Sequence, residues 1–338
     1  MQLFPLTVLV TGGGAVLGQG IIKSLKASSL DARIIVADPN PLSVGLYWGD
    51  ERAALPLASD ASYGDAVRAL LTRYRPDVVL VGTDVELPFF AAEREALERA
   101  FETKVLVSDP CVVAIADDKY ATFRFMRDAG FHPPASALPE NGEDMARLIE
   151  DVGFPLVVKP RIGARAVGVS VVRDRQALAD ALEGREGLVV QECVGTDATE
   201  YTAGTLSFDG ETRASIVLRR DLRDGNTHRA FHEPDEALDT QVRAFADALQ
   251  PYGPANFQFR TDADGRARVF EINARFSGTT PMRAMMGFNE VEMCIHHLLS
   301  GRTVEQPAIR PGTVLRYLDE IFVPADTDTE PAQCAVSR

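Results

Sequence analysis

Short apolar runs alternate with amphipathic segments along the first third of the chain. The apolar runs, each of a length typical of a buried strand, occupy residues 6–10, 33–38, 77–82 and 104–109. Segments with apolar residues at helical spacing lie between them, at 64–74 and 86–102. This alternation predicts an open, doubly wound parallel sheet with right-handed crossovers, which is an α/β fold of the Rossmann-like kind.

The pattern changes near residue 115, where strands begin to bracket a glycine-rich loop. After a helical segment at 117–130, the expected elements are strands at 155–160, 169–174 and 188–194, a loop at 161–168 and a helix at 176–187. These elements predict a compact α+β lobe.

Longer alternating stretches follow from residue 195. They indicate antiparallel strands at 200–210 and 212–221 and a hairpin over 256–273 that turns at Ala-Asp-Gly 263–265. Helical patterns cover 235–253 and 290–301. We therefore expect a Rossmann-like domain at 1–112, a small α+β lobe at 113–194, a larger antiparallel-sheet lobe at 195–322 and a poorly ordered polar tail at 323–338.

Composition and charge exclude several classes of protein. The 338 residues are 46% hydrophobic and carry a formal net charge of −14, which argues against a general nucleic-acid binder and leaves no nucleic-acid partner expected. No apolar run is long enough for a membrane span and the first residues do not resemble a signal peptide, so we expect a cytoplasmic protein without a membrane partner. The four cysteines are scattered and form no CxxC pair, which excludes a zinc knuckle.

A glycine-rich turn, TGGGAVLGQG at 11–20, follows the first apolar run. Gly12, Gly14 and Gly18 have the spacing GxGxxxG, which is close to the dinucleotide-binding fingerprint, and Asp38 ends the next apolar run. One hypothesis is therefore an NAD(P)-dependent oxidoreductase built on this turn. The spacing is one residue longer than the usual fingerprint, and no catalytic set accompanies it.

Two strand ends in the middle of the chain carry polar groups. Lys159 ends the apolar strand VVKP before the glycine loop, where an ammonium group suits a polyphosphate, although a solvated strand end is an equally ordinary interpretation. Gln191 and Glu192 end the strand LVVQE, where they could meet an adenine edge or lie on a sheet edge.

The strongest cluster lies in the predicted hairpin. Glu271 and Asn273 are two residues apart, so they share one face of a strand, and Gln258 joins that face if the hairpin forms. Three oxygen ligands without histidine or thiol suit Mg²⁺ carried by nucleotide phosphates. Arg275 follows on the same face and is well placed for a phosphate group.

Residues that could select a substrate follow other strands. Asp84 and Glu86 come after the third apolar run and would hold the ammonium group of an amino acid, or else cap and begin a helix. Arg283 lies on a helix that begins near Pro281, where it could help to cradle a carboxylate.

The order of these motifs resembles the ATP-grasp superfamily, in its branch of carboxylate–amine ligases similar to the carbamoyl phosphate synthase large chain. The resemblance covers about residues 6–320 and rests on Lys119, VVKP with the glycine loop, VVQE, EYT, SIVLRRDLRDGNTHRA, FQF and FEINARF. It implies a Rossmann-like pre-ATP-grasp domain followed by the two-lobed ATP-grasp fold. It also implies ATP and Mg²⁺, with Mn²⁺ as an alternative, as cofactors.

The resemblance further implies a role for each matching residue. Lys119 and Lys159 would hold phosphates, Glu200 the ribose, and Arg275 the γ-phosphate or acyl phosphate. The loop with Gly163 and Gly168 would close over the nucleotide. The remaining residues would bind adenine (Gln191, Glu192, Cys193, Val194), the phosphates more loosely (His228) and the metal (Gln258, Glu271, Asn273). Candidate substrate contacts rest on position at strand ends, at a helix start and in the glycine loop, not on the resemblance; they are Gly13, Gly14, Asp84, Glu86, Arg165 and Arg283.

The implied activity is ligation, in which a small-molecule carboxylate becomes an acyl phosphate and an amine then displaces phosphate to form an amide bond. Ala274 stands where the family usually has proline, a change that should not disturb metal ligation. The chain shows neither a duplicated half nor a glutaminase nucleophile, so we do not expect carbamoyl phosphate synthesis. A non-catalytic ATP-binding module is the other alternative. A homodimer is the expected assembly on general frequency alone.

Overall fold

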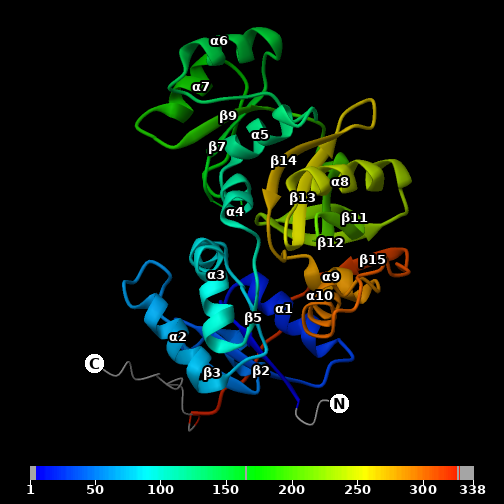
Figure 1. Cartoon of the computed structure of the whole chain (residues 1–338). Coiled ribbons are helices and arrows are strands. Elements are labelled where there is room, and N and C mark those ends of the chain that lie inside the picture. Colours follow the sequence, from blue (N-terminus) through cyan, green and yellow to red (C-terminus); the bar gives the residue numbers. More distant parts are fainter. Residues whose placement is uncertain (1–4, 164–165, 326, 328–338) are drawn as a thin grey trace.

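Three separate β-sheets organise the chain in the computed structural model, which describes residues 5–163, 166–325 and 327. Figure 1 shows the first sheet and its helices below, the second sheet above, and the third sheet to the right. The predicted mixture of a parallel sheet and antiparallel sheets is confirmed.

The first sheet is parallel and has five strands in the order β3-β2-β1-β4-β5. Its strands are β1 (Leu6–Val10), β2 (Ala32–Asp38), β3 (Glu51–Ala54), β4 (Val78–Leu80) and β5 (Lys104–Leu106). The intervening helices are α1 (Val16–Lys26), α2 (Tyr63–Tyr74) and α3 (Leu87–Phe101). Strand β3 is an addition to the prediction, because its sequence ERAA combines two half-buried charged residues with two alanines and has no run of large apolar residues.

The second sheet is antiparallel, with the order β6-β9-β7-β8, and forms the small lobe. Its strands are β6 (Ser136–Ala137), β7 (Leu156–Pro160), β8 (Ser170–Val172) and β9 (Leu188–Glu192). It carries α6 (Gly142–Asp151) and α7 (Arg175–Leu182), while α4 (Pro110–Asp117) and α5 (Lys119–Asp128) lead into it. The side chains of Asn141 and Asp174 cap α6 and α7 by accepting hydrogen bonds from backbone amides, which fixes where each helix begins.

The third sheet has six strands in the order β14-β13-β10-β11-β12-β15. The strands are β10 (Glu200–Phe208), β11 (Glu211–Arg223), β12 (Asn226–His232), β13 (Gly253–Thr261), β14 (Ala267–Asn273) and β15 (Gly312–Leu315). Helices α8 (Glu236–Leu249), α9 (Thr280–Met285) and α10 (Glu290–Ser300) belong to the same part of the chain. The predicted hairpin is confirmed, and its turn contains Gly265 with φ of 76°.

The hydrophobic cores explain which parts move together. One core joins the first sheet to the third, because Val8 and Ile21 pack in the same cluster as Leu206 and Phe288. The small lobe has its own core, built only from residues between Ala137 and Val190. The helices α4 and α5 pack on the third sheet, because Val112 and Met126 belong to the same apolar cluster as Phe257 and Ile272. The domain boundaries remain a prediction.

Candidate functional site

A cavity of 270 Å³ lies between the small lobe and the third sheet. One side consists of Lys119 and Lys159 with apolar residues of β7 and β8, and the facing side consists of polar residues from β10, β11, β13 and β14. Val157 and Lys159 are two residues apart and therefore share the inner face of β7. An apolar slot that ends in cations and carboxylates suits a ligand with a flat ring and a charged tail.

Lys159 is buried at 6% exposure and lies in the centre of this cavity. Its Nζ donates to Gln191 Oε1 at 2.7 Å and to the Phe270 carbonyl oxygen at 3.4 Å. Burial lowers the pKa of Lys159 to about 8, although the charge of Glu271 acts in the opposite direction. A desolvated ammonium without an adjacent carboxylate partner is a strong site for an anion. Gln191 thus positions Lys159.

Lys119, also buried, holds the start of the glycine loop. Its Nζ donates to the carbonyl oxygens of Gly163 at 2.7 Å and of Arg161 at 3.5 Å. Arg161 in turn forms an ion pair with Asp118, the residue that caps α5. Gly163 lines the cavity, whereas Gly168 accepts a hydrogen bond from Arg185 at 2.8 Å. Arg165 lies outside the described residues.

The oxygen-bearing side chains predicted on the hairpin converge as expected. Gln258 is directly opposite Glu271 in the strand register, and its Nε2 donates to Glu271 Oε1 at 2.9 Å. Asn273 Nδ2 donates to the same oxygen at 3.1 Å, while Ile272 points into the core. Within the described ranges there is no group of three or more His, Cys, Asp or Glu residues suited to a metal. One carboxylate with two amides fits a hard cation that brings phosphate ligands with it.

Arg275 extends this polar row towards the first sheet. Its guanidinium donates to the two carboxylate oxygens of Asp84, at 2.6 Å and 3.1 Å. It also donates to Asn273 Oδ1 at 2.8 Å. Asp84 is therefore neither the predicted helix cap nor a free carboxylate for an ammonium group, since its side chain is engaged by Arg275. The sequence did not suggest this pairing because the two residues are far apart in the chain.

Sequence reasoning missed two arginines that surround Glu200. Arg220 Nη2 donates to Glu200 Oε1 at 2.8 Å and to Gln258 Oε1 at 2.6 Å, and Arg260 Nε donates to Glu200 Oε2 at 2.9 Å. Both arginines line the cavity. The alternation of β11 was the available signal, because Arg220 is buried while Arg219 and Asp221 on either side are not.

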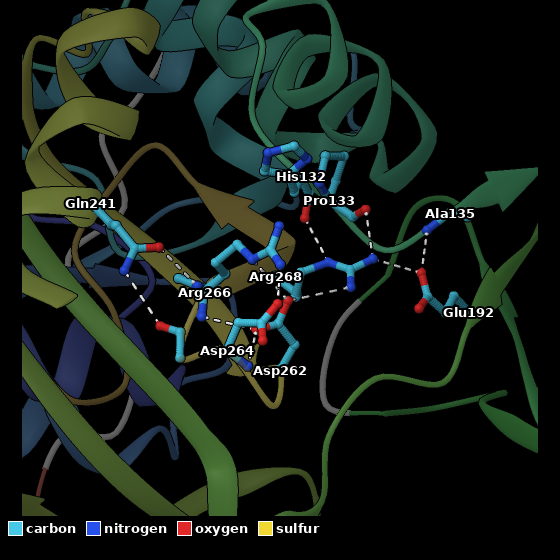
Figure 2. Close-up of polar contacts among 11 residues, drawn as sticks. His132, Pro133, Ala135, Glu192, Gln241, Asp262, Asp264, Arg266 and Arg268 are labelled. Atoms are coloured by element: carbon cyan, nitrogen blue, oxygen red, sulfur yellow. Dashed lines mark hydrogen bonds and ion pairs between the residues drawn. The ribbon is translucent and has the colours of Figure 1, made fainter. Parts of the chain in front are cut away.

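The adenine-binding residues expected at the end of β9 also line the cavity, namely Glu192, Cys193 and Val194. Glu192 is held by the backbone amide of Ala135 at 2.9 Å and by Arg268 at 2.7 Å, as Figure 2 shows. His228 is not among the described residues that line the cavity. It lies on β12, where its carbonyl oxygen accepts a hydrogen bond from the Arg316 amide.

The glycine turn after β1 does not offer the amides that were expected for a substrate. The Gly13 amide donates to the Ala37 carbonyl at 3.2 Å, and the Gly14 amide donates to Asp38 Oδ2 at 2.6 Å. Asp38 is saturated further by the Asn40 amide and the Ser43 hydroxyl. A Cβ on Gly14 would lie 2.3 Å from Ser43 Oγ, so the turn is packed against its own neighbours. The expectation that Gly13 and Gly14 bind substrate is wrong for this conformation.

Glu86 is likewise internal. It is 5% exposed and accepts hydrogen bonds from Thr11 at 2.8 Å, Tyr63 at 2.7 Å and Thr83 at 2.6 Å. Burial raises the pKa of Glu86, while the three hydroxyl donors act against that rise. The predicted role of Glu86 in binding an ammonium group is therefore wrong; it joins the ends of β1 and β4 instead.

Arg283 is buried too deeply to cradle a substrate. Its side chain is 1% exposed and pairs with Glu290, which is 0% exposed, at 3.2 Å. It also donates to Asn256, and a Cβ on Gly204 would lie 2.2 Å from its Nη1, so glycine is required there. Arg283 holds α9 and α10 against the sheet, and the predicted carboxylate contact is wrong.

Two family descriptions match this chain. Residues 185–321 match ATP-grasp in the biosynthetic pathway with Ter operon, and residues 116–230 match the RimK-like ATP-grasp domain. The two matches overlap and between them cover both walls of the cavity.

Curated relatives extend the similarity to the rest of the chain. A carbamoyl phosphate synthase large chain from Methanothrix thermoacetophila is 24% identical over 94% of this chain and 32% of its own length. The chain thus spans about a third of the length of such relatives. A D-alanine–D-alanine ligase from Dechloromonas aromatica is 29% identical over 47% of this chain and 58% of its own length.

Solved structures share the fold. The N5-carboxyaminoimidazole synthetase from Staphylococcus aureus, solved with ADP, gives a TM-score of 0.75 at 16% identity and covers 93% of this chain and 83% of its own. An L-amino acid ligase from Bacillus licheniformis gives 0.66 at 20% identity over 90% of this chain and 77% of its own. Within the part of the chain that the structure describes, no helix has the length and apolar character needed to cross a membrane.

Proposed function

Because two ATP-grasp descriptions match parts of this chain, we propose that it belongs to the ATP-grasp superfamily and is an ATP-dependent ligase that joins a small-molecule carboxylate to an amine. The products would be an amide or peptide-like bond, ADP and phosphate. The single observation that carries this proposal is the cavity in which buried Lys119 and Lys159 face Gln258 and Glu271.

Nucleotide binding is the first step of the proposed reaction. Val157 and the neighbouring valines would cover the adenine ring, while Glu192 and the backbone of Cys193 and Val194 would meet its edge. Lys119 and Lys159 would hold the phosphates. Support comes from structures of similar fold that were solved with ADP or Mg-ADP, such as the Staphylococcus aureus synthetase.

Charge neutralisation and positioning are the chemistry that this chain would supply. A substrate carboxylate attacks the γ-phosphate of ATP, the bond to the β-phosphate oxygen breaks, and the amine then displaces phosphate from the acyl phosphate. Lys159 and Arg275 would stabilise the negative charge of the transferred group. The loop at 161–168 would exclude water, which would otherwise hydrolyse the acyl phosphate.

Mg²⁺ would be held by Gln258, Glu271 and Asn273, and its chemistry there would be to neutralise phosphate charge. Mn²⁺ takes the same oxygen ligands and is proposed as an alternative ion. A homodimer and a cytoplasmic location belong to the same proposal, supported by the dimer named among the solved relatives and by the composition.

Two other functions were considered. An NAD(P)-dependent oxidoreductase is not favoured, because the amides of Gly13 and Gly14 and the carboxylate of Asp38 are engaged by one another and by neighbouring groups. A non-catalytic ATP-binding module would not need Arg275, which lies beyond the phosphate-facing lysines and next to the metal-binding row.

The experiment is a screen for ADP release with Mg-ATP, a panel of amino acids and other small acids, and hydroxylamine as a general amine. An acyl phosphate is trapped as a hydroxamate, so a positive well identifies the acid without knowledge of the amine. The Lys159→Met variant should lose the signal. ADP release that is independent of any acid, or unchanged in Lys159→Met, would overturn the proposal.

A further inference from the structure

Arg268, on β14, lies where the small lobe joins the third sheet. Its Nε donates to the His132 carbonyl at 2.7 Å, and its Nη2 donates to the Pro133 carbonyl at 3.2 Å. The same Nη2 donates to Glu192 Oε2 at 2.7 Å. One guanidinium therefore holds both connections of the small lobe, the entering one at 132–133 and the departing one at 192 (Figure 2).

The Arg268–Glu192 pair is shielded from solvent on both sides. The two side chains are 17% and 22% exposed, so their interaction is screened less than that of a surface pair. The Ala135 amide also donates to Glu192 Oε2, at 2.9 Å. Both contacts use the same oxygen, and no described residue bonds to Oε1. The carboxylate is thus fixed in orientation with one oxygen still able to accept a hydrogen bond.

The pair also separates two cavities. Glu192 lines the nucleotide cavity, whereas Arg268 lines a second cavity of 570 Å³ between α5, α6 and the β13–β14 turn. Arg268 is not among the described residues that line the nucleotide cavity, so it does not contact a nucleotide bound there directly. Its one hydrogen bond to a side chain that lines the nucleotide cavity is the one to Glu192, within the described residues.

We propose that Arg268 is a positioning residue for base recognition, which fixes Glu192 so that Oε1 accepts a hydrogen bond from the exocyclic amino group of adenine. This inference rests on the proposed binding of an adenine nucleotide. In ITP a carbonyl oxygen replaces the exocyclic amino group. Two acceptors, this oxygen and Glu192 Oε1, then face each other, so ITP binds less well than ATP. The residue would then set the choice of base without changing the chemistry at the phosphates.

The variant Arg268→Met removes the charge and the three hydrogen bonds described above but keeps a flexible, unbranched side chain. Without its partner, Glu192 loses its fixed orientation. The affinity therefore falls only for a nucleotide whose base donates a hydrogen bond to Glu192. We expect Mg-ATP binding to weaken about tenfold, Mg-ITP binding to change less than about twofold, and the ATP:ITP preference to fall by about the same tenfold. Turnover at saturating ATP should change little, which separates KM from kcat.

A matched control is available two residues away. Arg266 is 50% exposed and its ion pairs among the described residues are with Asp264 and with Asp262, which also lies 3.8 Å from Arg268 Nη1; it has no hydrogen bond to Glu192 or to the lobe connections there, so Arg266→Met should leave the ATP:ITP preference unchanged. Glu192→Gln is the positive control and should lower the same preference. The double variant Arg268→Met with Glu192→Gln should lose little more than either single variant, because both changes interrupt one interaction.

The test is calorimetric titration of Mg-ATP and Mg-ITP into the full chain and these variants. Wild-type protein that binds Mg-ATP, with Arg268→Met retaining the wild-type preference, would overturn this inference and leave the proposed function standing. An equal loss of affinity for both nucleotides would assign Arg268 a merely structural role and also overturn it. Wild-type protein that binds neither nucleotide would overturn the proposed function and this inference with it.

Discussion

Arg275 and Asp84, which are 191 positions apart in the sequence, form a two-point ion pair that joins the hairpin of the third sheet to the end of β4 in the first. The guanidinium is 9% exposed, and it also donates to Asn273 Oδ1 and to the Phe276 carbonyl. Its orientation is therefore set from two domains. A cation fixed in this way needs little reorganisation when a phosphoryl group arrives.

The first prediction concerns Asp84. Asp84→Asn removes the charge that orients Arg275, so ADP release should fall by about tenfold, in line with the loss of a charge-assisted hydrogen bond. Nucleotide affinity should not change, because Asp84 does not line the nucleotide cavity. Asp109→Asn, which interrupts the exposed Arg94–Asp109 pair, is the control. Unchanged turnover in Asp84→Asn would show that the orientation of the Arg275 guanidinium does not depend on the charge of Asp84.

The second prediction concerns Lys159 and pH. Its pKa is about 8 in the free protein, and a bound phosphate would raise it. Mg-ADP affinity should therefore be constant below about pH 8 and fall by up to about tenfold per pH unit above it. Lys159→Arg keeps the charge and should abolish this pH dependence. Calorimetry across the pH range checks both, and the same slope in Lys159→Arg would assign the titration to another group.

Lys159 should also affect stability. Because its folded pKa is lowered from the usual 10.5, the unfolded chain binds more protons between about pH 8 and pH 10.5, and the free energy of unfolding contributed by this group rises with pH in that window. Lys159→Met should lack this increment. The measurement is urea unfolding at several pH values. The free energy of unfolding of the wild type minus that of Lys159→Met should rise between about pH 8 and pH 10.5, and a fall would contradict the lowered pKa.

The third prediction concerns the oxygen-ligand row. Glu271→Gln keeps a side chain that can bond to Gln258 and Asn273 but removes the only carboxylate of the row. The increase in ADP affinity on adding Mg²⁺ should shrink by at least about tenfold, while affinity without the metal changes little. Glu211→Gln, at the exposed start of β11, is the control. Full retention of the Mg²⁺ effect would remove Glu271 from the metal site.

The fourth prediction concerns the buried pair of Arg283 and Glu290. Arg283→Met leaves Glu290 charged in the interior and should lower the free energy of unfolding by about 3–5 kcal/mol. The double variant Arg283→Met with Glu290→Met should recover part of that loss, because no charge is then left unpaired. Denaturant unfolding measures both. A double variant as unstable as the sum of its single variants would contradict the ion-pair account.

The sequence was sufficient for the longer apolar strands and for the polar row on the hairpin because both are local patterns, whereas β3, β12 and β15 were not expected. Alternation with period two puts Glu271 and Asn273 on one face, and the Gly265 turn fixes Gln258 opposite Glu271. The short strand β6 was missed because two residues are too few for a periodic signal, whereas the helix expected near Pro281 is present as α9.

The sequence could not separate a polar residue that serves a ligand from one that serves the fold. Glu86 and Arg283 follow strands or begin helices as binding residues do, but their partners come from other elements. Arg268 was overlooked for the same reason: its hydrogen-bond partners lie 76 to 136 residues away in the sequence. Only the packing of the domains shows which of these groups are already paired.

The most direct test of the whole account is calorimetric binding of Mg-ADP to the wild-type chain and to Lys159→Met, with NAD as the competing ligand. The account predicts that Mg-ADP binds, that Lys159→Met weakens it by at least about tenfold, and that NAD produces no heat. Binding of NAD in place of Mg-ADP, or Mg-ADP affinity that is unaffected by Lys159→Met, would contradict it.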